Sequence, residues 1–350
     1  MHYIQLKKVS KYWGSTRAVE NLDIDIDKGE FIVFLGPSGC GKSTTLRLIA
    51  GLEEVSSGEI YIDGVNVNKM DPAIRNISMV FQSYALFPHL NVDENIIFGL
   101  KVRKVEKKER QSRLARVSEI VGLNDLLKRK PSELSGGQRQ RVALARAIIS
   151  GNPICLMDEP LSNLDAKLRH HMRVEIREIQ KNLGITLIYV THDQTEAMSM
   201  ADKIVLMNEG EIVQQGSPKN LFKNPEQIFT AKFIGNPPMN LIEAESDGKS
   251  NFIIHDENKI TLITDEDQRK IIGLRPEDIR ISETGIKCKV NYLDYHGADA
   301  IITTILGNQN INIKINSKKI DQLSDEIFIE WEIEDLKIFD YESGEKAAGM

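Results

Sequence analysis

Short runs of apolar residues alternate with longer, mostly polar stretches over the first 235 residues of the chain. Phe31–Leu35, Ile154–Met157 and Leu187–Val190 are continuously apolar, which is typical of strands buried on both faces. Thr44–Ala50 begins a helix behind the first of them. Strands that alternate with helices predict an α/β fold with a parallel sheet. Such sheets bind ligands outside the carboxyl ends of their strands, so the residues that follow each run are candidate site residues.

A long charged segment lies between the first and the second of these runs. Residues from about Asp93 to Ile149 carry many Lys, Arg and Glu and are predicted to be helical. Asn91 or Asp93 is a candidate cap for one helix, and Ser135 is a candidate cap for another. The segment has no sustained heptads and predicts no coiled coil. We therefore expect a helical subdomain at about residues 84–150.

The character of the chain changes at the breaker cluster Gly235-Asn236-Pro237-Pro238. We place a domain boundary there, between residues 1–238 and residues 239–350. Beyond it, short β-rich runs are separated by Gly, Asn and Asp, which predicts a small barrel or sandwich. The predicted strands are Phe252–Ile254, Ile260–Ile263, Lys270–Leu274, Lys287–Leu293, Ala300–Ile305, Asn310–Ile315 and Ile327–Ile333.

The composition is that of an ordinary globular protein, since 41% of the 350 residues are hydrophobic and 27% are charged. This length is sufficient for two domains. No apolar run approaches the ~20 residues that span a bilayer, and the N-terminus lacks the features of a signal peptide. Three widely spaced cysteines without a CxxC pair argue against a disulfide framework or a zinc site, and fit a reducing cytosol. If the protein acts at a membrane, other subunits must supply the spanning helices.

Charge is distributed unevenly between the two predicted domains. Residues 241–350 contain 13 Lys and Arg against 23 Asp and Glu, a net charge of −10, whereas the whole chain carries −6. Binding to a phosphate backbone requires a basic face. The acidic tail therefore argues against nucleic acid as a partner.

The apolar run that ends at Leu35 leads directly into a complete P-loop pattern, Gly36-Pro37-Ser38-Gly39-Cys40-Gly41-Lys42-Ser43, which is followed by Thr44. Its glycines allow the backbone to turn tightly and to point N–H groups at phosphates, at the start of a helix whose dipole favours anions. Lys42 is expected to reach the β- and γ-phosphates of ATP, and Ser43 to ligate Mg²⁺. Cys40 is either a small filler of the loop or a redox-sensitive residue.

Two further motifs follow the P-loop. About ninety residues after it comes the segment Leu134-Ser135-Gly136-Gly137-Gln138, and then an apolar run that ends in Asp158 and Glu159. In P-loop ATPases the first carboxylate of such a pair holds the Mg²⁺ shell. The second is expected to orient the attacking water, which needs an acceptor in line with the γ-phosphoryl group.

This combination of motifs resembles the ATP-binding subunits of ABC transporters. The resemblance implies that His192 contacts the γ-phosphate and that Gln82 joins the Mg²⁺ and water shell, so both are assigned to catalysis beside Glu159. It also implies that Trp13 stacks on adenine, although a core aromatic is the competing interpretation. The segment Leu134–Gln138 and Asp165 are implied to act on the ATP held by the opposite subunit of a head-to-tail homodimer.

Several segments resemble one branch of that family, the importer subunits for carbohydrates and sn-glycerol-3-phosphate (the MalK/UgpC type). They are Gly36–Thr45, Val80–His89, Met157–Arg169, Tyr189–Met198, Gly235–Asn240 and Gly273–Asp278. The branch implies an α/β fold of P-loop NTPase type with a helical subdomain, followed by an OB-like β-barrel (TOBE/MOP-like) regulatory domain. It also implies that Tyr84, Leu86 and Phe87 lie where a permease docks.

The function expected from this resemblance is ATP hydrolysis, with ATP and Mg²⁺ as ligands, coupled to solute import. Two permease subunits and an extracytoplasmic solute-binding protein are the implied partners, on the cytoplasmic face of the membrane. The first candidate solute is sn-glycerol-3-phosphate, a sugar or oligosaccharide is the alternative, and polyamine or ferric iron follow. The rival of another class is a soluble ABC ATPase without a transport role, which usually has two nucleotide domains per chain, whereas one P-loop occurs here.

Overall fold

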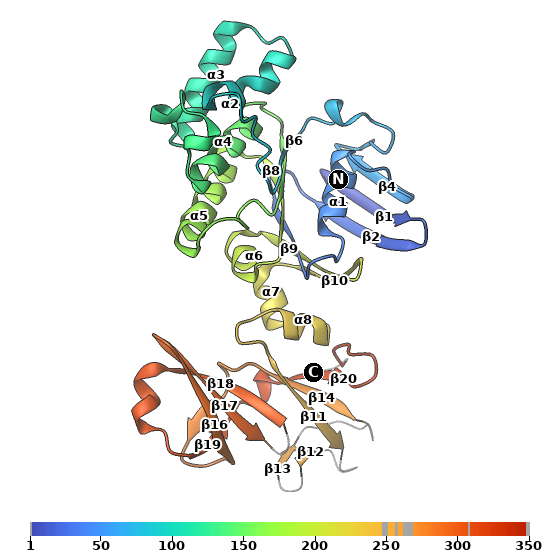
Figure 1. Cartoon of the computed structure of the whole chain (residues 1–350). Helices are drawn as coiled ribbons and strands as arrows, with labels where there is room; N and C mark the ends of the chain where they lie inside the picture. Colours follow the sequence, from blue (N-terminus) through green and yellow to red (C-terminus); the bar gives the residue numbers. More distant parts are fainter. Residues whose placement is uncertain (1, 247–250, 256–257, 262–268, 307–308, 348–350) are drawn as a thin grey trace. The chain divides into compact units, whose positions relative to one another are not determined.

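The computed structural model describes residues 2–246, 251–255, 258–261, 269–306 and 309–347 (Figure 1). The chain forms two compact units, Met1–Pro218 and Lys219–Met350. This division lies earlier than the predicted boundary at residue 238, because the helices α7 (Pro218–Lys223) and α8 (Ile228–Phe233) are grouped with the tail. The Arg275 guanidinium of the tail donates to the carbonyl oxygens of Phe222 and Ile234, and so ties the carboxyl-terminal ends of both helices to the second unit.

A six-stranded, mostly parallel sheet forms the centre of the first unit, as the apolar runs predict. Its strand order is β10-β9-β3-β8-β7-β6, and only β10 is antiparallel to its neighbour. All five residues of β3 and of β7 are buried, since helices and a second sheet cover both faces. The strands are β3 (Phe31–Leu35), β6 (Ile77–Val80), β7 (Ile154–Asp158), β8 (Thr186–Thr191), β9 (Lys203–Asn208) and β10 (Glu211–Gly216).

A four-stranded antiparallel sheet, which the sequence pattern did not predict, packs against the same core. Its order is β2-β1-β4-β5. Buried and exposed residues alternate along the second half of β2, as in a strand with one face in the core. The hydrophobic core joins Ile4 of this sheet, Leu46 of the helix α1 and Ile188 of the parallel sheet. The elements are β1 (Ile4–Trp13), β2 (Thr16–Ile26), β4 (Ser57–Ile62), β5 (Val65–Asn66) and α1 (Lys42–Ala50).

The predicted helical subdomain is present, and its helices begin at polar caps. Asn91, rather than Asp93, caps the first helix, in a reciprocal arrangement with Glu94. Ser135 caps another helix, as predicted, with Gln138 as its reciprocal partner. Among the helices in the described part of the chain, none combines the length and the apolar character needed to cross a membrane. The longer helices after α1 are α2 (Val92–Val102), α3 (Lys107–Ile120), α4 (Gly136–Ile148), α5 (Ala166–Leu183) and α6 (Gln194–Met200).

The tail contains two five-stranded antiparallel sheets and has an OB-like, strand-rich fold. Their orders are β13-β12-β11-β14-β20 and β15-β19-β16-β17-β18. A core rich in isoleucine, which includes Ile272, Ile302 and Ile313, draws on both sheets. The strands are β11 (Asn240–Ser246), β12 (Asn251–His255), β13 (Asn258–Thr261), β14 (Lys270–Leu274), β15 (Arg280–Ser282), β16 (Ile286–His296), β17 (Asp299–Leu306), β18 (Gln309–Asn316), β19 (Glu326–Glu330) and β20 (Lys337–Asp340).

Six of the seven runs predicted as tail strands coincide with a strand of the structure for most of their length, and the run Ile260–Ile263 coincides with β13 over its first two residues. The end of one run, at Ile263, lies outside the described residues. Ile333 begins a 3₁₀ helix instead of ending a strand. The prediction missed β11, β15 and β20. β15 has three residues and β20 has four, which is too short for a periodic signal.

Candidate active site

Four neighbouring parallel strands end at one edge of the central sheet, and each is followed by a predicted site residue. β3 leads into the P-loop, β8 into His192, β7 into the pair Asp158 and Glu159, and β6 into Gln82. Because the carboxyl ends of parallel strands meet at the same edge, residues far apart in the sequence come together there. The site therefore lies where the order of apolar runs and polar endings predicted it.

The P-loop is closed over the Lys42 side chain. The Nζ atom donates to the carbonyl oxygens of Gly36 at 2.8 Å and of Pro37 at 2.6 Å, and Lys42 is only 4% exposed. The first N–H groups of α1 have no partners within the helix, as at every helix start. Gly41, which precedes α1 with a φ of +102°, has no side chain that could accept hydrogen bonds from them. A buried ammonium group beside free N–H groups and a helix N-terminus is a site for an anion.

Cys40 of the same loop is 3% exposed. Burial raises the pKa of its thiol, while the neighbouring Lys42 lowers it. A buried thiol with a raised pKa carries little thiolate and reacts slowly. This environment favours Cys40 as a packing residue over Cys40 as a redox switch.

Ser43 and Asp158 meet across the base of the site. The Ser43 hydroxyl donates to Asp158 Oδ1 at 2.6 Å, and Asp158 is 7% exposed. Within the described residues, no three His, Cys, Asp or Glu side chains gather into a group able to hold a metal ion by themselves. Mg²⁺ is usually bound through a few protein oxygens together with the phosphates of a substrate. The hydroxyl and carboxylate oxygens present here fit that ion.

Glu159 stands in an unusual backbone conformation. Its φ is +43°, a left-handed value that few residues other than glycine adopt, and its N–H donates to the carbonyl of Val190 at 3.1 Å. Its carboxylate Oε2 lies 3.3 Å from His192 Nδ1 and 3.4 Å from Gln82 Nε2. Backbone strain of this kind persists where the surrounding structure enforces it, and it concentrates in functional sites. The three predicted catalytic side chains are thus brought together around one carboxylate.

Gln82 also connects this cluster to the loop that follows β7. Its side-chain amide Nε2 is 3.5 Å from Ser162 Oγ, and its main-chain carbonyl oxygen accepts from Asn163 Nδ2 at 3.3 Å. The Ser162 hydroxyl in turn donates to the carbonyl of Glu159 at 2.9 Å. The loop 162–165 is therefore in contact with the predicted catalytic groups.

The predicted signature segment lies against the start of α5. A Cβ added at Gly136 would come within 3.1 Å of Leu164, and one added at Gly137 within 2.8 Å of Leu168. Asp165 caps α5 by accepting the N–H of Leu168 at 3.0 Å. The glycines thus allow the signature helix α4 and the predicted Asp165 loop to pack closely within one chain.

Trp13 is 49% exposed, so it is not a core aromatic. It pairs with Thr16 across the hairpin of β1 and β2. Two residues further along β2, the carbonyl oxygen of Ala18 lies 2.8 Å from the position of a Cβ added at Gly41. An exposed aromatic ring on a hairpin that abuts the P-loop leaves the adenine-stacking interpretation in place.

The residues predicted to dock a permease differ in exposure. Tyr84 is 6% exposed, with a φ of +62°. The Arg146 guanidinium, which donates to the carbonyls of Tyr84 and Ala85, holds this turn. Leu86 and Phe87 are half-buried, and the Phe87 ring packs on Phe98 with 4.4 Å between centroids. The Tyr84 side chain therefore packs beneath this segment and supports it, since its ring does not lie on the surface.

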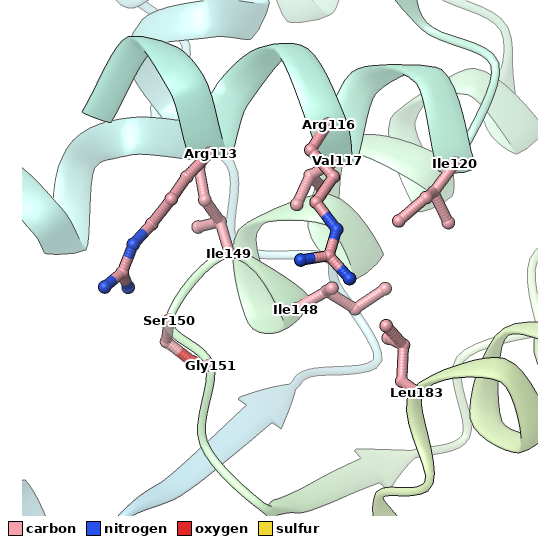
Figure 2. A pocket seen from close by; sticks show the side chains of 9 residues that line it. All are labelled: Arg113, Arg116, Val117, Ile120, Ile148, Ile149, Ser150, Gly151 and Leu183. Carbon is pink, nitrogen blue, oxygen red and sulfur yellow. The ribbon is translucent and has the colours of Figure 1, made fainter. Parts of the chain in front are cut away.

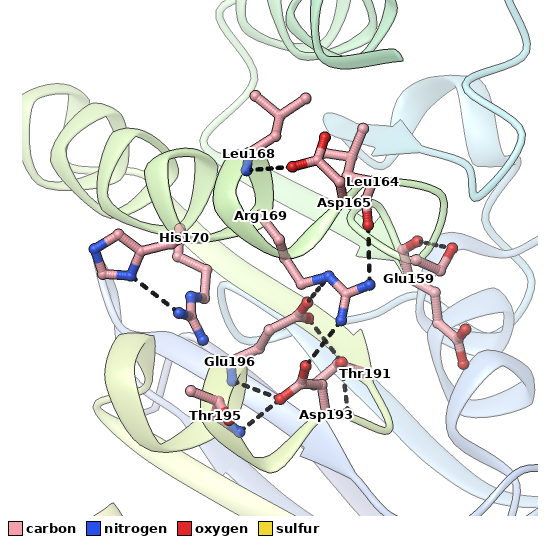
Figure 3. A network of polar contacts seen from close by, with 12 residues as sticks. Glu159, Leu164, Asp165, Leu168, Arg169, His170, Thr191, Asp193, Thr195 and Glu196 are labelled. Atoms are coloured by element: carbon pink, nitrogen blue, oxygen red, sulfur yellow. Dashed lines mark hydrogen bonds and ion pairs between the residues drawn. The ribbon is translucent and has the colours of Figure 1, made fainter. Parts of the chain in front are cut away.

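A network behind the predicted catalytic groups was not predicted from the sequence. Arg169, Asp193 and Glu196 interact beside Thr191 and the loop that ends at Asp165 (Figure 3). Its members stand on α5, on α6 and between β8 and α6. The one local signal in the sequence was Asp193 ahead of a short helix, a position typical of an N-cap.

A cavity of about 430 Å³ lies in another part of the first unit, between α3 and the ends of α4 and α5 (Figure 2). Arg113 and Arg116 extend from α3, Arg116 toward Ile148 and Leu183 and Arg113 above Ser150. Its other lining residues are Val117, Ile120, Ile149, Ser150 and Gly151. This set contains none of the predicted site residues.

Known proteins share both the fold and the motifs. The family model described as ABC transporter matches residues 19–162. The oligosaccharides import ATP-binding protein MsmX of Bacillus subtilis is 43% identical over 360 residues, which cover 98% of this chain and 99% of the relative. The sn-glycerol-3-phosphate import ATP-binding protein UgpC 2 of Agrobacterium fabrum is 42% identical, with 99% and 95% covered. A solved structure, the dimeric ATP-binding cassette MJ0796 in a post-hydrolysis state with ADP and phosphate, is 34% identical with a TM-score of 0.56, covering 61% of this chain and 98% of that one.

The fold and the residues at the sheet edge define a P-loop ATPase of the ABC type. The chain belongs to the ABC transporter family, among the ATP-binding subunits of sugar and glycerol-3-phosphate importers, and its activity is ATP hydrolysis.

Proposed function

We propose that this chain couples ATP hydrolysis to solute uptake through two permease subunits, as a dimer that closes on ATP and opens after hydrolysis. The observation that carries the proposal is the convergence of Glu159, His192 and Gln82 beside the P-loop and the Ser43–Asp158 pair. A module that only binds nucleotide has no need of a carboxylate and an imidazole held together at that place.

In this proposal each residue has a separate task. Lys42 and the N–H groups at the start of α1 hold the phosphates, and Ser43 and Asp158 hold Mg²⁺. The ion, when bound, neutralises negative charge on the phosphates. Glu159 accepts a hydrogen bond from the attacking water and orients it, and His192, 3.3 Å away, keeps that carboxylate in place. Gln82 contacts the same carboxylate from the end of β6, which lies on the other side of β7 from β8.

We assign the signature segment Leu134–Gln138 and Asp165 to the ATP of the partner subunit. One chain has one P-loop and one such segment, so two chains in head-to-tail arrangement make two composite sites. The N-terminus of α4, which has Ser135 as its cap and begins with two glycines, supports this role because helix N-termini attract anions. Trp13 is assigned to the adenine of the nucleotide held by its own chain.

Mixing of subunits tests the composite site. Lys42→Ala and Ser135→Arg chains are each expected to be inactive alone, but a mixed dimer retains one intact site. Random assembly of an equal mixture gives about half mixed dimers, and so about a quarter of the wild-type ATPase rate. If the mixture were no more active than its components, the assignment of Ser135 to the partner's site would be wrong.

A matched pair of variants tests the catalytic assignment. Glu159→Gln retains size and is expected to bind ATP normally while turnover falls by about two to three powers of ten. Glu175→Gln, an acid on α5 that pairs with Arg141, serves as the control and should leave turnover unchanged. Near-normal hydrolysis by Glu159→Gln would remove Glu159 from its role.

We place the protein peripherally on the cytoplasmic face of the membrane, with Leu86 and Phe87 at the permease contact. Both are partly accessible, whereas the buried Tyr84 supports the shape of the segment. Charged substitutions at Leu86 are therefore expected to spare ATP binding and to abolish transport. Membrane attachment in cells that lack the permeases would contradict this assignment.

For the solute we propose sn-glycerol-3-phosphate, with an oligosaccharide as the second candidate. The likeness to UgpC 2 supports the first, and the likeness to MsmX supports the second. The ATP-binding subunit does not touch the solute, so the test is made in cells. Uptake of labelled glycerol-3-phosphate and of labelled maltodextrin is compared between cells with the wild-type chain and cells with Glu159→Gln. Loss of maltodextrin uptake alone would favour the second candidate.

A further inference from the structure

Arg169 joins segments of the chain that meet behind the catalytic groups (Figure 3). It lies in the first turn of α5, and its Nη2 atom donates to the carbonyl of Leu164 at 3.0 Å. Its Nη1 atom donates to Asp193 Oδ2 at 3.2 Å. Because a guanidinium group is planar and presents its donors in a fixed geometry, one side chain sets the distance between the Leu164 carbonyl and the residue after His192.

Asp193 transmits this position to His192. Its other oxygen, Oδ1, accepts the N–H groups of Thr195 at 2.7 Å and of Glu196 at 3.2 Å, and so caps α6. Its own N–H donates to Thr191 Oγ1 at 3.0 Å. His192 is therefore flanked on both sides by residues whose polar groups are fixed, although its own side chain is exposed.

Glu196 forms the buried base of the network. It is 3% exposed, and its Oε2 atom accepts from the hydroxyls of Tyr189 at 2.9 Å and Thr191 at 2.7 Å. Burial raises the pKa of Glu196, and the nearby Asp193 adds to this effect, whereas the two hydroxyls and Arg169 lower it. The carboxylate is thus bound at one oxygen, and Arg169 faces the other.

The contact between Arg169 and Glu196 is incomplete. Arg169 Nε is buried, has no hydrogen-bond partner, and lies 3.9 Å from Glu196 Oε1. A buried donor without a partner is unfavourable. A displacement of about 1 Å would convert this ion pair into a charge-assisted hydrogen bond. The Arg169 guanidinium is thus incompletely bound in this arrangement, and a small movement is sufficient to complete its contact with Glu196.

We infer that Arg169 is a positioning residue, which couples the loop 162–165 to His192 and thereby holds His192 against Glu159. The inference rests on the proposed function, in which His192 acts in catalysis and Asp165 faces the partner's nucleotide. Closure of the dimer on ATP presses on the loop, the Leu164 carbonyl carries this displacement to the guanidinium, and Asp193 carries it to His192.

The experiment uses the purified full-length chain and measures kcat and KM for ATP. Arg169→Gln removes the charge and two of the contacts, and Arg169→Lys keeps the charge on a single nitrogen. Arg177→Gln is the matched control, because Arg177 also lies on α5 and donates to an aspartate, Asp202, at 3.0 Å. Thermal unfolding of each variant establishes that it is folded at the assay temperature.

Arg169→Gln is expected to lower kcat by about tenfold or more while KM for ATP changes by less than about twofold, since misplacing a group by 1 Å can cost this much. Arg169→Lys is expected to fall between Arg169→Gln and wild type, and Arg177→Gln to match wild type. In a chain that already carries His192→Gln, Arg169→Gln is expected to have no further effect, because a positioning residue has nothing left to position.

Three results would overturn the inference. The first is that Arg169→Gln lowers kcat by the same factor with and without His192→Gln. The second is that Arg177→Gln loses as much activity as Arg169→Gln, or that both Arg169 variants are inactive because they are unfolded. Either outcome would make the role of Arg169 purely structural. The third is full activity of His192→Gln alone, which refutes the proposed catalytic role of His192 as well. Only this third result would also contradict the proposed function.

Discussion

Two glycines of the P-loop allow steric collision to be separated from backbone strain. A Cβ added at Gly36, where φ is +152°, would lie 2.1 Å from the carbonyl oxygen of Met207. At Gly39, where φ is +82°, nothing lies within 4 Å of the added Cβ. The Met207 carbonyl belongs to β9, which pairs with β3 directly before the loop, so it cannot withdraw easily. We therefore expect Gly36→Ala to be much more damaging than Gly39→Ala.

The magnitudes follow from the two terms. A left-handed conformation costs a residue with a Cβ roughly 1–2 kcal/mol, which is the whole cost at Gly39. Overpacking adds about 1–3 kcal/mol, and a backbone obstacle puts Gly36 at the upper end, so about 4 kcal/mol in all. For a unit of about 200 residues, 1 kcal/mol shifts Tm by about 2–4 °C. Gly39→Ala is then expected to lower Tm by about 2–8 °C, and Gly36→Ala by roughly 8–16 °C.

Circular dichroism melts of the two variants and of wild type, without nucleotide, measure these shifts, and a binding assay with labelled ATP follows. Gly39→Ala is expected to lose ATP affinity beyond its small loss of stability, because its methyl group would occupy the open side of a loop that is proposed to bind the phosphates. Equal Tm values for the two variants would refute the steric reasoning. If Gly36→Ala had the same Tm as wild type, the loop would be far less rigid than its contacts indicate.

Other predictions concern titration, thiols and the tail. Hydrogen bonds from the Ser343 N–H and from Lys270 hold the pKa of Asp340 at about 2, below its usual value of 3.8. Its contribution is present above about pH 4 and is lost as the pH falls toward 2, so Asp340→Asn should lower Tm at pH 7 but not at pH 2. All three cysteines are buried, and burial raises the pKa of Cys155 to about 12, so a maleimide should label the chain only after denaturation. A chain that ends at Pro218 is expected to bind ATP, because the P-loop and the catalytic residues lie upstream of the tail unit; a folded but non-binding product would contradict this.

The parts of this molecule that could be predicted from sequence are those that a local pattern encodes. β3 and β7 are predicted correctly because a continuous apolar run buried on both faces has few alternatives. His192 could be placed at the sheet edge because it follows a predicted strand of the parallel sheet. Gln82 is assigned from the resemblance alone, since no strand is predicted before it. The caps Asn91 and Ser135 follow from residue type and from a Glu or Gln three positions later.

The remaining features depend on contacts between distant residues. The bridge from Arg169 to Asp193 spans 24 residues, and nothing near either residue indicates the other. The chain turns at Tyr84 with a positive φ, and the side chain is buried there. No glycine in the sequence indicates this turn. The tail unit begins before the breaker cluster at Pro238 because Arg275, far downstream, binds carbonyls at the carboxyl ends of α7 and α8. Each of these results from tertiary structure overriding a local signal.

The three side chains proposed to act in catalysis are not held equally firmly, and this difference affects which of them would move first. Glu159 is tied by its N–H to Val190 of β8, the strand that also carries His192, so these two groups move together. Gln82 is bound to Glu159 and Ser162 only by hydrogen bonds of 3.4 and 3.5 Å, at the weak limit for such contacts, and it is exposed. It also begins the turn 82–85, which directly precedes Leu86 and Phe87. If Leu86 and Phe87 contact a permease, as proposed above, a movement there is expected to displace Gln82 from Glu159 before it disturbs the Glu159–His192 pair, which would make Gln82 the member of the site best suited to respond to the permease.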